Sequence, residues 1–188
     1  METMLLPTST DHKGQDVFRT ISITSLFTGT LDIVAANIYF YFKADHGAAL
    51  KLTGTDEPVS FFTYLTHGGP GRIFSYIAKA VFDPTTHEKL LVAWGVVLHY
   101  TIAFLFTGFL FLIYPAVMKW LKNRHVIAIA YGVCIWAIMN LAVVPLSKLD
   151  TTPSDLKEAI IAGFIQTLMI GLPVAWAAHR FYSKKQAS

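Results

Sequence analysis

Four long apolar stretches constrain this chain more than any other feature of its sequence. They cover 21–42, 90–118, 126–146 and 159–181. An α-helix rises ~1.5 Å per residue, so ~20 apolar residues cross the ~30 Å hydrocarbon core of a bilayer. The chain is 54% hydrophobic and only 14% charged, against about 25% charged residues in soluble domains. The sequence therefore predicts one all-α domain, 21–182, an integral-membrane four-helix bundle.

The basic residues indicate the orientation of the bundle. In a four-span zigzag, the head 1–20, the link 119–125 and the tail 183–188 lie on one side of the membrane. That side carries the densest group of cations: Lys13, Arg19, Lys119, Lys122, Arg124, Arg180, Lys184 and Lys185. The positive-inside rule then predicts that both termini are cytoplasmic, in the inner membrane of a bacterium. The head is too polar for a signal peptide, so the first span should remain as an anchor.

The loop 43–89 is expected on the outer side. His67 begins a break that also contains Gly68, Gly69, Pro70 and Gly71, and Gly and Pro together end regular elements. After this break an apolar stripe recurs at helical spacing: Ile73, Phe74, Ile77, Ala78 and Val81, with Arg72, Ser75 and Lys79 off the stripe. This pattern predicts a short amphipathic helix, either lying on the membrane surface or packing on the bundle.

Shorter signals mark other positions. Thr152, Pro153, Ser154 and Asp155 should begin the fourth span as an N-cap, a first-turn proline and a first-turn acid. Pro115, Pro145 and Pro173 predict kinks or stops near span ends. Cys134, the single cysteine, forms no internal disulfide and is interpreted as a small buried apolar residue.

Each span carries one strongly polar residue well inside it: Asp32, His99, Asn140 and Gln166. Counting inward from the span ends puts all four at a similar depth, and Asn37 lies about one turn further along the first span. A charge at such a depth costs ~2.5–3.5 kcal/mol on insertion scales unless it is paired, wet or neutralised. We therefore predict a polar layer inside the bundle, with His99 as the partner of Asp32.

Small residues flank the polar positions and predict close helix packing. They recur at i, i+3 and i+4 around Gly29, and at spacing four around Gly95 and along the fourth span through Gly163 and Gly171. Small residues let membrane helices approach closely without a hydrophobic force between them. Gln166 lies beside its stripe, so its direction is open.

An Asp32–His99 pair permits two interpretations. Aspartate beside imidazole can exchange a proton as one titrating unit, which suits a proton sensor or one step of a proton path. The alternative is a static hydrogen-bond cluster, in which Asn140 and Gln166 satisfy spare groups and the layer only fixes helix packing.

Other chemistry is not indicated. No catalytic or nucleotide-binding fingerprint occurs, and the loop histidines His46, His67 and His87 lack metal-ligand spacing. An axial haem pair would need two deep histidines, and only His99 is deep, so we expect no cofactor and no metal. His125 and His179, at the predicted cytoplasmic interface, suit either anionic lipid or solvent. The charge of +3 gives no nucleic-acid footprint, whereas membrane lipids are expected partners and the small-residue faces also suit a homo-oligomer.

Several stretches resemble the YagU-like family of small bacterial inner-membrane proteins. They are 28–36 (TGTLDIVAA), 98–107 (LHYTIAFLFT), 112–115 (LIYP), 136–147 (WAIMNLAVVPLS) and 171–173 (GLP). The resemblance implies a four-span inner-membrane protein linked to acid resistance, with no established biochemical activity. Asp32, His99 and Asn140 lie within these stretches, and Gln166 does not.

Three functions follow as hypotheses. The first is proton or ion handling in acid or envelope stress, through the polar layer. The second is a structural or partner-binding membrane subunit. The third is a membrane-embedded enzyme acting on a lipid or small solute through His99 and Asp32. It ranks last because no serine or threonine has an evident activating partner, and the sequence favours a protein that is not an enzyme.

Overall fold

Helices account for almost all of the described chain. The structure is a computed structural model that describes residues 9–43, 60–66, 68–82, 87–146 and 156–186. Within these ranges no residue is in a β-strand. The long helices are α1 (Ser9–Lys43), α5 (Glu88–Leu121), α6 (Arg124–Ala137) and the α8–α9 rod, which comprises α8 (Leu156–Gln166) and α9 (Leu172–Gln186). The predicted all-α four-helix architecture is confirmed.

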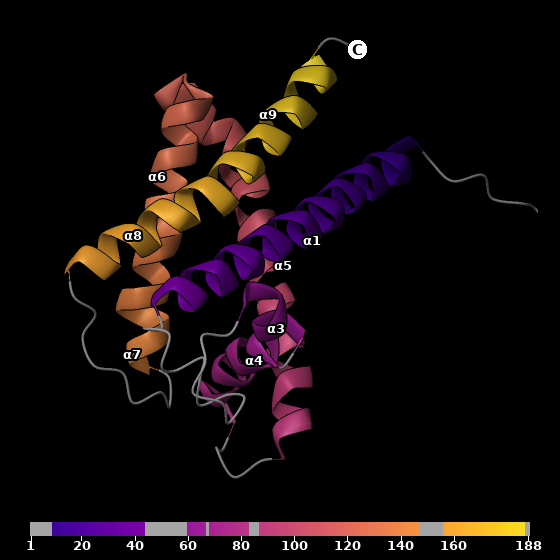
Figure 1. Ribbon diagram of the computed structural model, residues 1–188. Helices are drawn as coiled ribbons and strands as arrows, with labels where there is room; N and C mark the ends of the chain where they lie inside the picture. The colour runs from indigo at the N-terminus through magenta and orange to yellow at the C-terminus, as the bar shows by residue number, and fades with distance from the viewer. Residues whose placement is uncertain (1–8, 44–59, 67, 83–86, 147–155, 187–188) are drawn as a thin grey trace, which may run out of the picture.

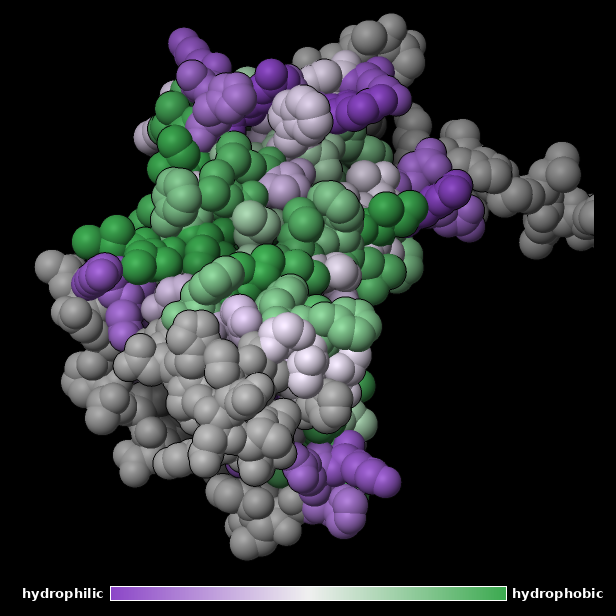
Figure 2. All heavy atoms as spheres, in the orientation of Figure 1, coloured by the Kyte–Doolittle hydropathy of each residue, from purple (hydrophilic) through white to green (hydrophobic). Residues whose placement is uncertain are grey.

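The described helices contain four segments that are long and apolar enough to cross a membrane. They are Gly14–Phe42, Glu88–Leu121, Arg124–Val143 and Lys157–Lys184. In Figure 2 hydrophobic residues form a band across the middle of the visible face, and hydrophilic residues gather above and below it. Such a band is expected where lipid replaces water around a bundle. The chain is thus a multi-pass membrane protein.

The helices extend beyond the predicted spans. α1 begins at Ser9 rather than Ile21, and α9 continues to Gln186. A span is bounded by hydropathy, whereas a helix continues into water as long as its backbone hydrogen bonds are retained. The sequence-based bounds therefore mark the apolar part of each helix and not its ends.

The rods are arranged as two crossing layers. Figure 1 shows α1 and the α8–α9 rod running antiparallel across α5 and α6, with the start of α1 and the end of α9 on the same side. Contacts link α1 to α5 and α9, and link α6 to α8 and α9. The predicted N-cap at 152–155 and the loop 44–59 lie outside the described residues.

Two of the membrane-crossing rods contain a π-helical segment before a proline. Ile138–Val143 lies between α6 and α7 (Val144–Leu146), ahead of Pro145, and Thr167–Gly171 precedes Pro173. Proline lacks an N–H and its ring collides with the carbonyl four residues earlier, so the preceding turn must widen or bend. The sequence predicted a kink or a stop at these prolines, and at Pro145 and Pro173 the structure has a π-helical widening of the rod instead. Pro115 lies inside α5.

The helix predicted in the first loop packs on the bundle. α3 (Phe61–Thr66) leads into α4 (Gly69–Lys79), and a Cβ on Gly95 of α5 would collide with the backbone of Phe74. Of the two predicted placements, packing on the bundle is therefore the one observed. Two details of the predicted stripe are wrong: Ser75 is buried at 6% exposure, and Val81, beyond the helix end, is 54% exposed. The close backbone approach favours a small side chain at the contact.

A second close helix contact joins α6 to the fourth rod. A Cβ on Gly132 would collide with the backbone of Thr167, and one on Gly171 would collide with the carbonyl of Ala128. Residues spaced by four on an α-helix rotate around its axis by about 40° at each step. The wider π-helical turn at Thr167–Gly171 offsets part of this rotation, which helps to keep the small residues of the fourth rod facing α6. Cys134, on the other side of α6, is exposed, which corrects its interpretation as a buried residue. The side chain projects away from the protein core.

Candidate functional site

Asp32 and His99 come together where α1 crosses α5. The charge of His99 acts directly on the carboxyl group of Asp32, and both side chains are half-buried. Asp32 follows Gly29 by three residues, so the two lie on the same face of α1. The sequence predicted Asp32 and His99 as partners, and at this crossing their side chains are close enough to interact electrostatically.

A backbone carbonyl holds the His99 ring. Its Nε2 atom lies 2.8 Å from the carbonyl oxygen of Gly29. A carbonyl only accepts, so Nε2 carries the hydrogen and donates it. Nδ1 is then the nitrogen that can gain or lose a proton. The hydrogen bond therefore fixes the orientation of the ring and leaves Nδ1 without the hydrogen.

Aromatic rings enclose the imidazole. Phe74 of α4 and Tyr100 both meet it edge to face, with ring centroids 5.9 and 5.2 Å away. Tyr100 also lies against Gly29, where an added Cβ would be 3.1 Å from the ring, and its hydroxyl is 3.0 Å from that of Thr30. The docked helix α4 therefore forms one wall of the site and limits access to it.

Buried polar atoms without hydrogen-bond partners lie on the three helices that form the site. Asn37 donates through Nδ2 to the carbonyl of Ile33 at 2.7 Å, but its Oδ1 has no hydrogen-bond partner in the described structure. The same holds for the hydroxyls of Ser75 on α4 and Thr107 on α5. An unsatisfied buried oxygen costs ~1–3 kcal/mol. The helices α1, α4 and α5 therefore each have a buried oxygen that could accept a further hydrogen bond.

Asn140 and Gln166 lie on the third and fourth membrane-crossing rods. Asn140 lies in the π-helical segment and donates to the carbonyl of Trp136 in its own rod at 2.9 Å. Gln166 Oε1 and Trp136 Nε1 are both buried without a hydrogen-bond partner. No hydrogen bond in the described structure joins Asn140 or Gln166 to Asp32 or His99. The polar residues thus form two local groups, one at α1–α4–α5 and one at α6–α8.

The four glycines singled out by the sequence differ in how tightly they pack. An added Cβ would collide with backbone at Gly95 and Gly171, would press on Tyr100 at Gly29, and would make ordinary contact with Trp136, 3.5 Å away, at Gly163. Gly132, which the sequence did not single out, is among the tightest. No spacing rule distinguishes these positions, because the partner backbone comes from another helix.

A further polar group, unnoticed in the sequence, lies near the ends of α5 and α9. His179 Nδ1 is 3.1 Å from the hydroxyl of Tyr114, and Tyr182 donates to the carbonyl of Phe111 at 2.7 Å. The rings of Tyr114 and Tyr182 stack at an interplanar angle of 6°. His179 is therefore engaged within the protein, and this cluster fastens α9 to α5.

The described residues contain no group of three or more histidine, cysteine or carboxylate side chains that could hold a metal ion. Comparison of the chain with protein-family models, with curated proteins and with solved structures finds no match.

Proposed function

We propose that Asp32 and His99 form a proton-exchanging pair, and that the protein handles protons or ions in acid or envelope stress. The observation that carries the proposal is the fixed His99 ring. Nε2 is held by the Gly29 carbonyl at 2.8 Å, and the ring interacts electrostatically with the carboxyl group of Asp32. Ionisable groups inside membrane helices usually mark proton or ion pathways.

The cellular setting is part of the same proposal. The distribution of cations favours cytoplasmic termini and a bacterial inner membrane. The resemblance to the YagU-like family supports a role in acid resistance. Because a four-helix monomer has little room for a wide pore, a conducting role would require a homo-oligomer in contact with membrane lipids. The exposed apolar helix faces are suited to such an assembly.

A flux assay with matched variants tests the proposal. Purified protein in liposomes, loaded with a pH-sensitive dye, is given an inward proton gradient. We expect wild-type flux, and its loss in Asp32→Asn and His99→Gln, since neither amide exchanges protons. Thr30→Val is the matched control, because it removes a polar contact between the same two helices, 3.0 Å to Tyr100, without removing a titratable group.

Two results would contradict the proposal. Flux that does not depend on the pH gradient in the wild type, together with unchanged acid survival of cells carrying Asp32→Asn, rules out a proton role. Equal loss in Thr30→Val would assign the effect to helix packing.

A structural role is the second candidate, and one observation favours it. The amide nitrogens of Asn37 and Asn140 donate to carbonyls of their own rods, as expected of polar residues whose hydrogen bonds remain local. If Asp32→Asn and His99→Ala abolish folding but leave activity per folded molecule unchanged, the polar residues serve packing only.

A further inference from the structure

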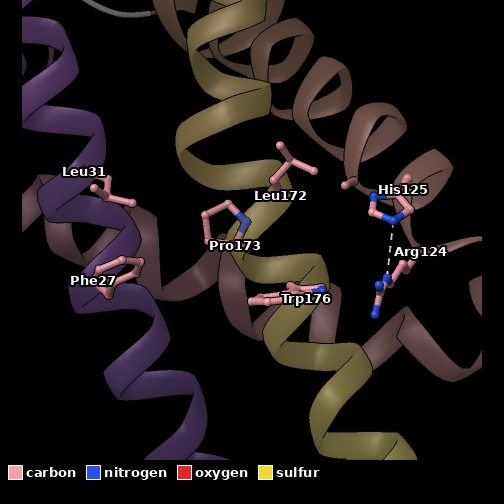
Figure 3. Close-up of a pocket in the computed structure, with 8 residues that line it drawn as sticks. Phe27, Leu31, Arg124, His125, Leu172, Pro173 and Trp176 are labelled. Carbon is pink, nitrogen blue, oxygen red and sulfur yellow. Dashed lines mark hydrogen bonds between the residues drawn. The ribbon is translucent and has the colours of Figure 1, made fainter.

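A hollow opens between α1, α6 and α9, away from the Asp32–His99 pair. Its volume is about 450 Å³, within the ~300–1,000 Å³ of ligand pockets. The walls are almost entirely apolar and are formed by Phe27, Leu31, Ala128, Leu172, Pro173 and Trp176. Figure 3 shows Phe27 and Leu31 on α1 facing Pro173 and Trp176 on α9 across the gap.

The apolar walls remain uncovered by the rest of the described protein. Phe27 is 57% exposed and Trp176 is 62% exposed. Both belong to segments long and apolar enough to cross the membrane. In a bilayer this surface meets hydrocarbon chains, so the hollow is open to lipid from the side.

Two basic side chains form one rim of the hollow. Arg124 and His125 begin α6 and both line it. The guanidinium of Arg124 lies 5.9 Å from the centroid of the Trp176 ring, and its Nε donates toward His125 Nε2 at 3.4 Å. Arg124 thus bridges from the membrane-surface end of α6 to the aromatic wall on α9.

Among the described residues that line the hollow, none is a carboxylate that would match the positive charge of the rim. The side-chain contacts described for Arg124 are to His125 and to the face of Trp176, and neither partner is negatively charged. The guanidinium presents its donors as a planar fork that fits phosphate oxygens in pairs. A phosphate at this rim would complete the guanidinium contacts and approach His125 as well.

We propose that this hollow binds an anionic phospholipid from the leaflet next to the α5–α6 link. The headgroup phosphate contacts Arg124 and His125, and an acyl chain lies between α1 and α9 against Phe27, Leu31, Leu172 and Trp176. Basic pockets between membrane helices that lead into apolar grooves fit anionic lipids in this way. The site is independent of the Asp32–His99 pair.

The shape and charge of the hollow favour a lipid over a second copy of the chain. An acyl chain needs apolar walls, and its headgroup needs cations at one end of them. The hollow has both, because its walls are apolar and Arg124 and His125 lie at one rim. An interface with a helix of another copy would need a broad, closely packed face of small residues, whereas the walls here are large and separated.

A binding assay on the full chain tests the proposal. Detergent-purified protein is titrated with dioleoyl phosphatidylglycerol, dioleoyl phosphatidylcholine or glycerol 3-phosphate, and thermal stability and native mass spectra are recorded. We expect the phosphatidylglycerol to bind and stabilise the protein more than the phosphatidylcholine. Arg124→Gln should weaken that preference about tenfold, the effect of losing a charge-assisted hydrogen bond.

Lys119→Gln is the matched control, since Lys119 is exposed near the same link but does not line the hollow. Its variant should retain the wild-type preference. Equal binding of the two lipids, or equal loss in Lys119→Gln and Arg124→Gln, would overturn the proposal in favour of diffuse surface charge. Stabilisation by glycerol 3-phosphate as strong as that by the lipid would overturn the acyl-chain part.

Photocrosslinking tests the site in the wild-type protein and so does not depend on the folding of the Arg124→Gln variant. Wild-type protein is irradiated with phosphatidylglycerol that carries a diazirine in its acyl chain. Labels should concentrate on 27–31 and 172–176. An even spread that also covers Leu105, Leu112 and Leu141, which are exposed but do not line the hollow, would show that no defined site exists.

Discussion

His99 Nε2 lies 2.8 Å from the carbonyl oxygen of Gly29, and Asp32 is one helical turn further along the same helix. The carbonyl fixes the tautomer and orientation of the ring, and the carboxyl group responds to its charge. One short stretch of α1 therefore both holds the imidazole and provides its electrostatic partner. The interaction with His99 gives the carboxyl group of Asp32 a polar neighbour within an apolar span.

The first prediction concerns the His99 tautomer. In protein labelled with ¹⁵N-histidine, the neutral His99 ring should show the Nε2–H form, because the Gly29 carbonyl accepts only from a hydrogen on that nitrogen. His99→Leu should lose ~1 kcal/mol of stability through the missing hydrogen bond, whereas His99→Gln retains a donor and should lose less. A Nδ1–H tautomer would contradict the geometry.

The second prediction compares two glycines on one interface. Gly132→Ala should destabilise the bundle by ~1–3 kcal/mol, because its Cβ collides with the backbone of Thr167. Gly163→Ala should be neutral or stabilising, since its Cβ meets Trp136 at an ordinary 3.5 Å and alanine favours helix by ~1 kcal/mol over glycine. Thermal melting in detergent measures both, and equal effects would contradict the close approach of the two rods.

The third prediction concerns the docking of α4. Gly95→Ala should push α4 away from α5, because the new methyl group meets the Phe74 backbone. Hydrogen exchange should then increase in 69–79 and stay unchanged in 124–137. Gly108→Ala, with only Ile21 nearby at 3.9 Å, is the control on the same helix. Unchanged exchange in α4 would show that the docking does not depend on Gly95.

The fourth prediction concerns alkaline pH. Burial raises the pKa of Tyr64, partly offset by the charge of Arg72, and burial also raises the pKa of Tyr76. The unfolded chain then loses these protons first, near pH 10, so the folded state binds more protons above that pH and its stability falls as pH rises. Below pH 10 the contribution is constant.

In the Tyr64→Phe variant the melting temperature should therefore fall less steeply between pH 9 and about 11.5. The remaining fall in this range is the part due to Tyr76. The double variant with Tyr76→Phe should flatten it further. A wild-type slope in both variants would show that these tyrosines are as solvated as in the unfolded chain.

Much of the architecture is predictable because it depends on local properties. Length and hydropathy define the four spans, since a helix must satisfy its own backbone in lipid. Pro145 and Pro173 mark places where the rods depart from a regular α-helix, because proline has a steric effect on its own rod, although the sequence predicted a kink or a stop there and not a π-helical segment. The pairing of Asp32 with His99 was also predictable, from the cost of a charge in hydrocarbon.

What only the tertiary structure decided is which helix faces meet. Lipid is as apolar as leucine, so an apolar pattern does not specify which face contacts another helix. The sequence predicted one polar layer, and in the described structure no hydrogen bond joins Asp32 or His99 to Asn140 or Gln166. The crossing of the rods brings Gly132 against Thr167 and leaves a hollow beside Arg124, because close approach and gaps depend on the backbones of two helices at once.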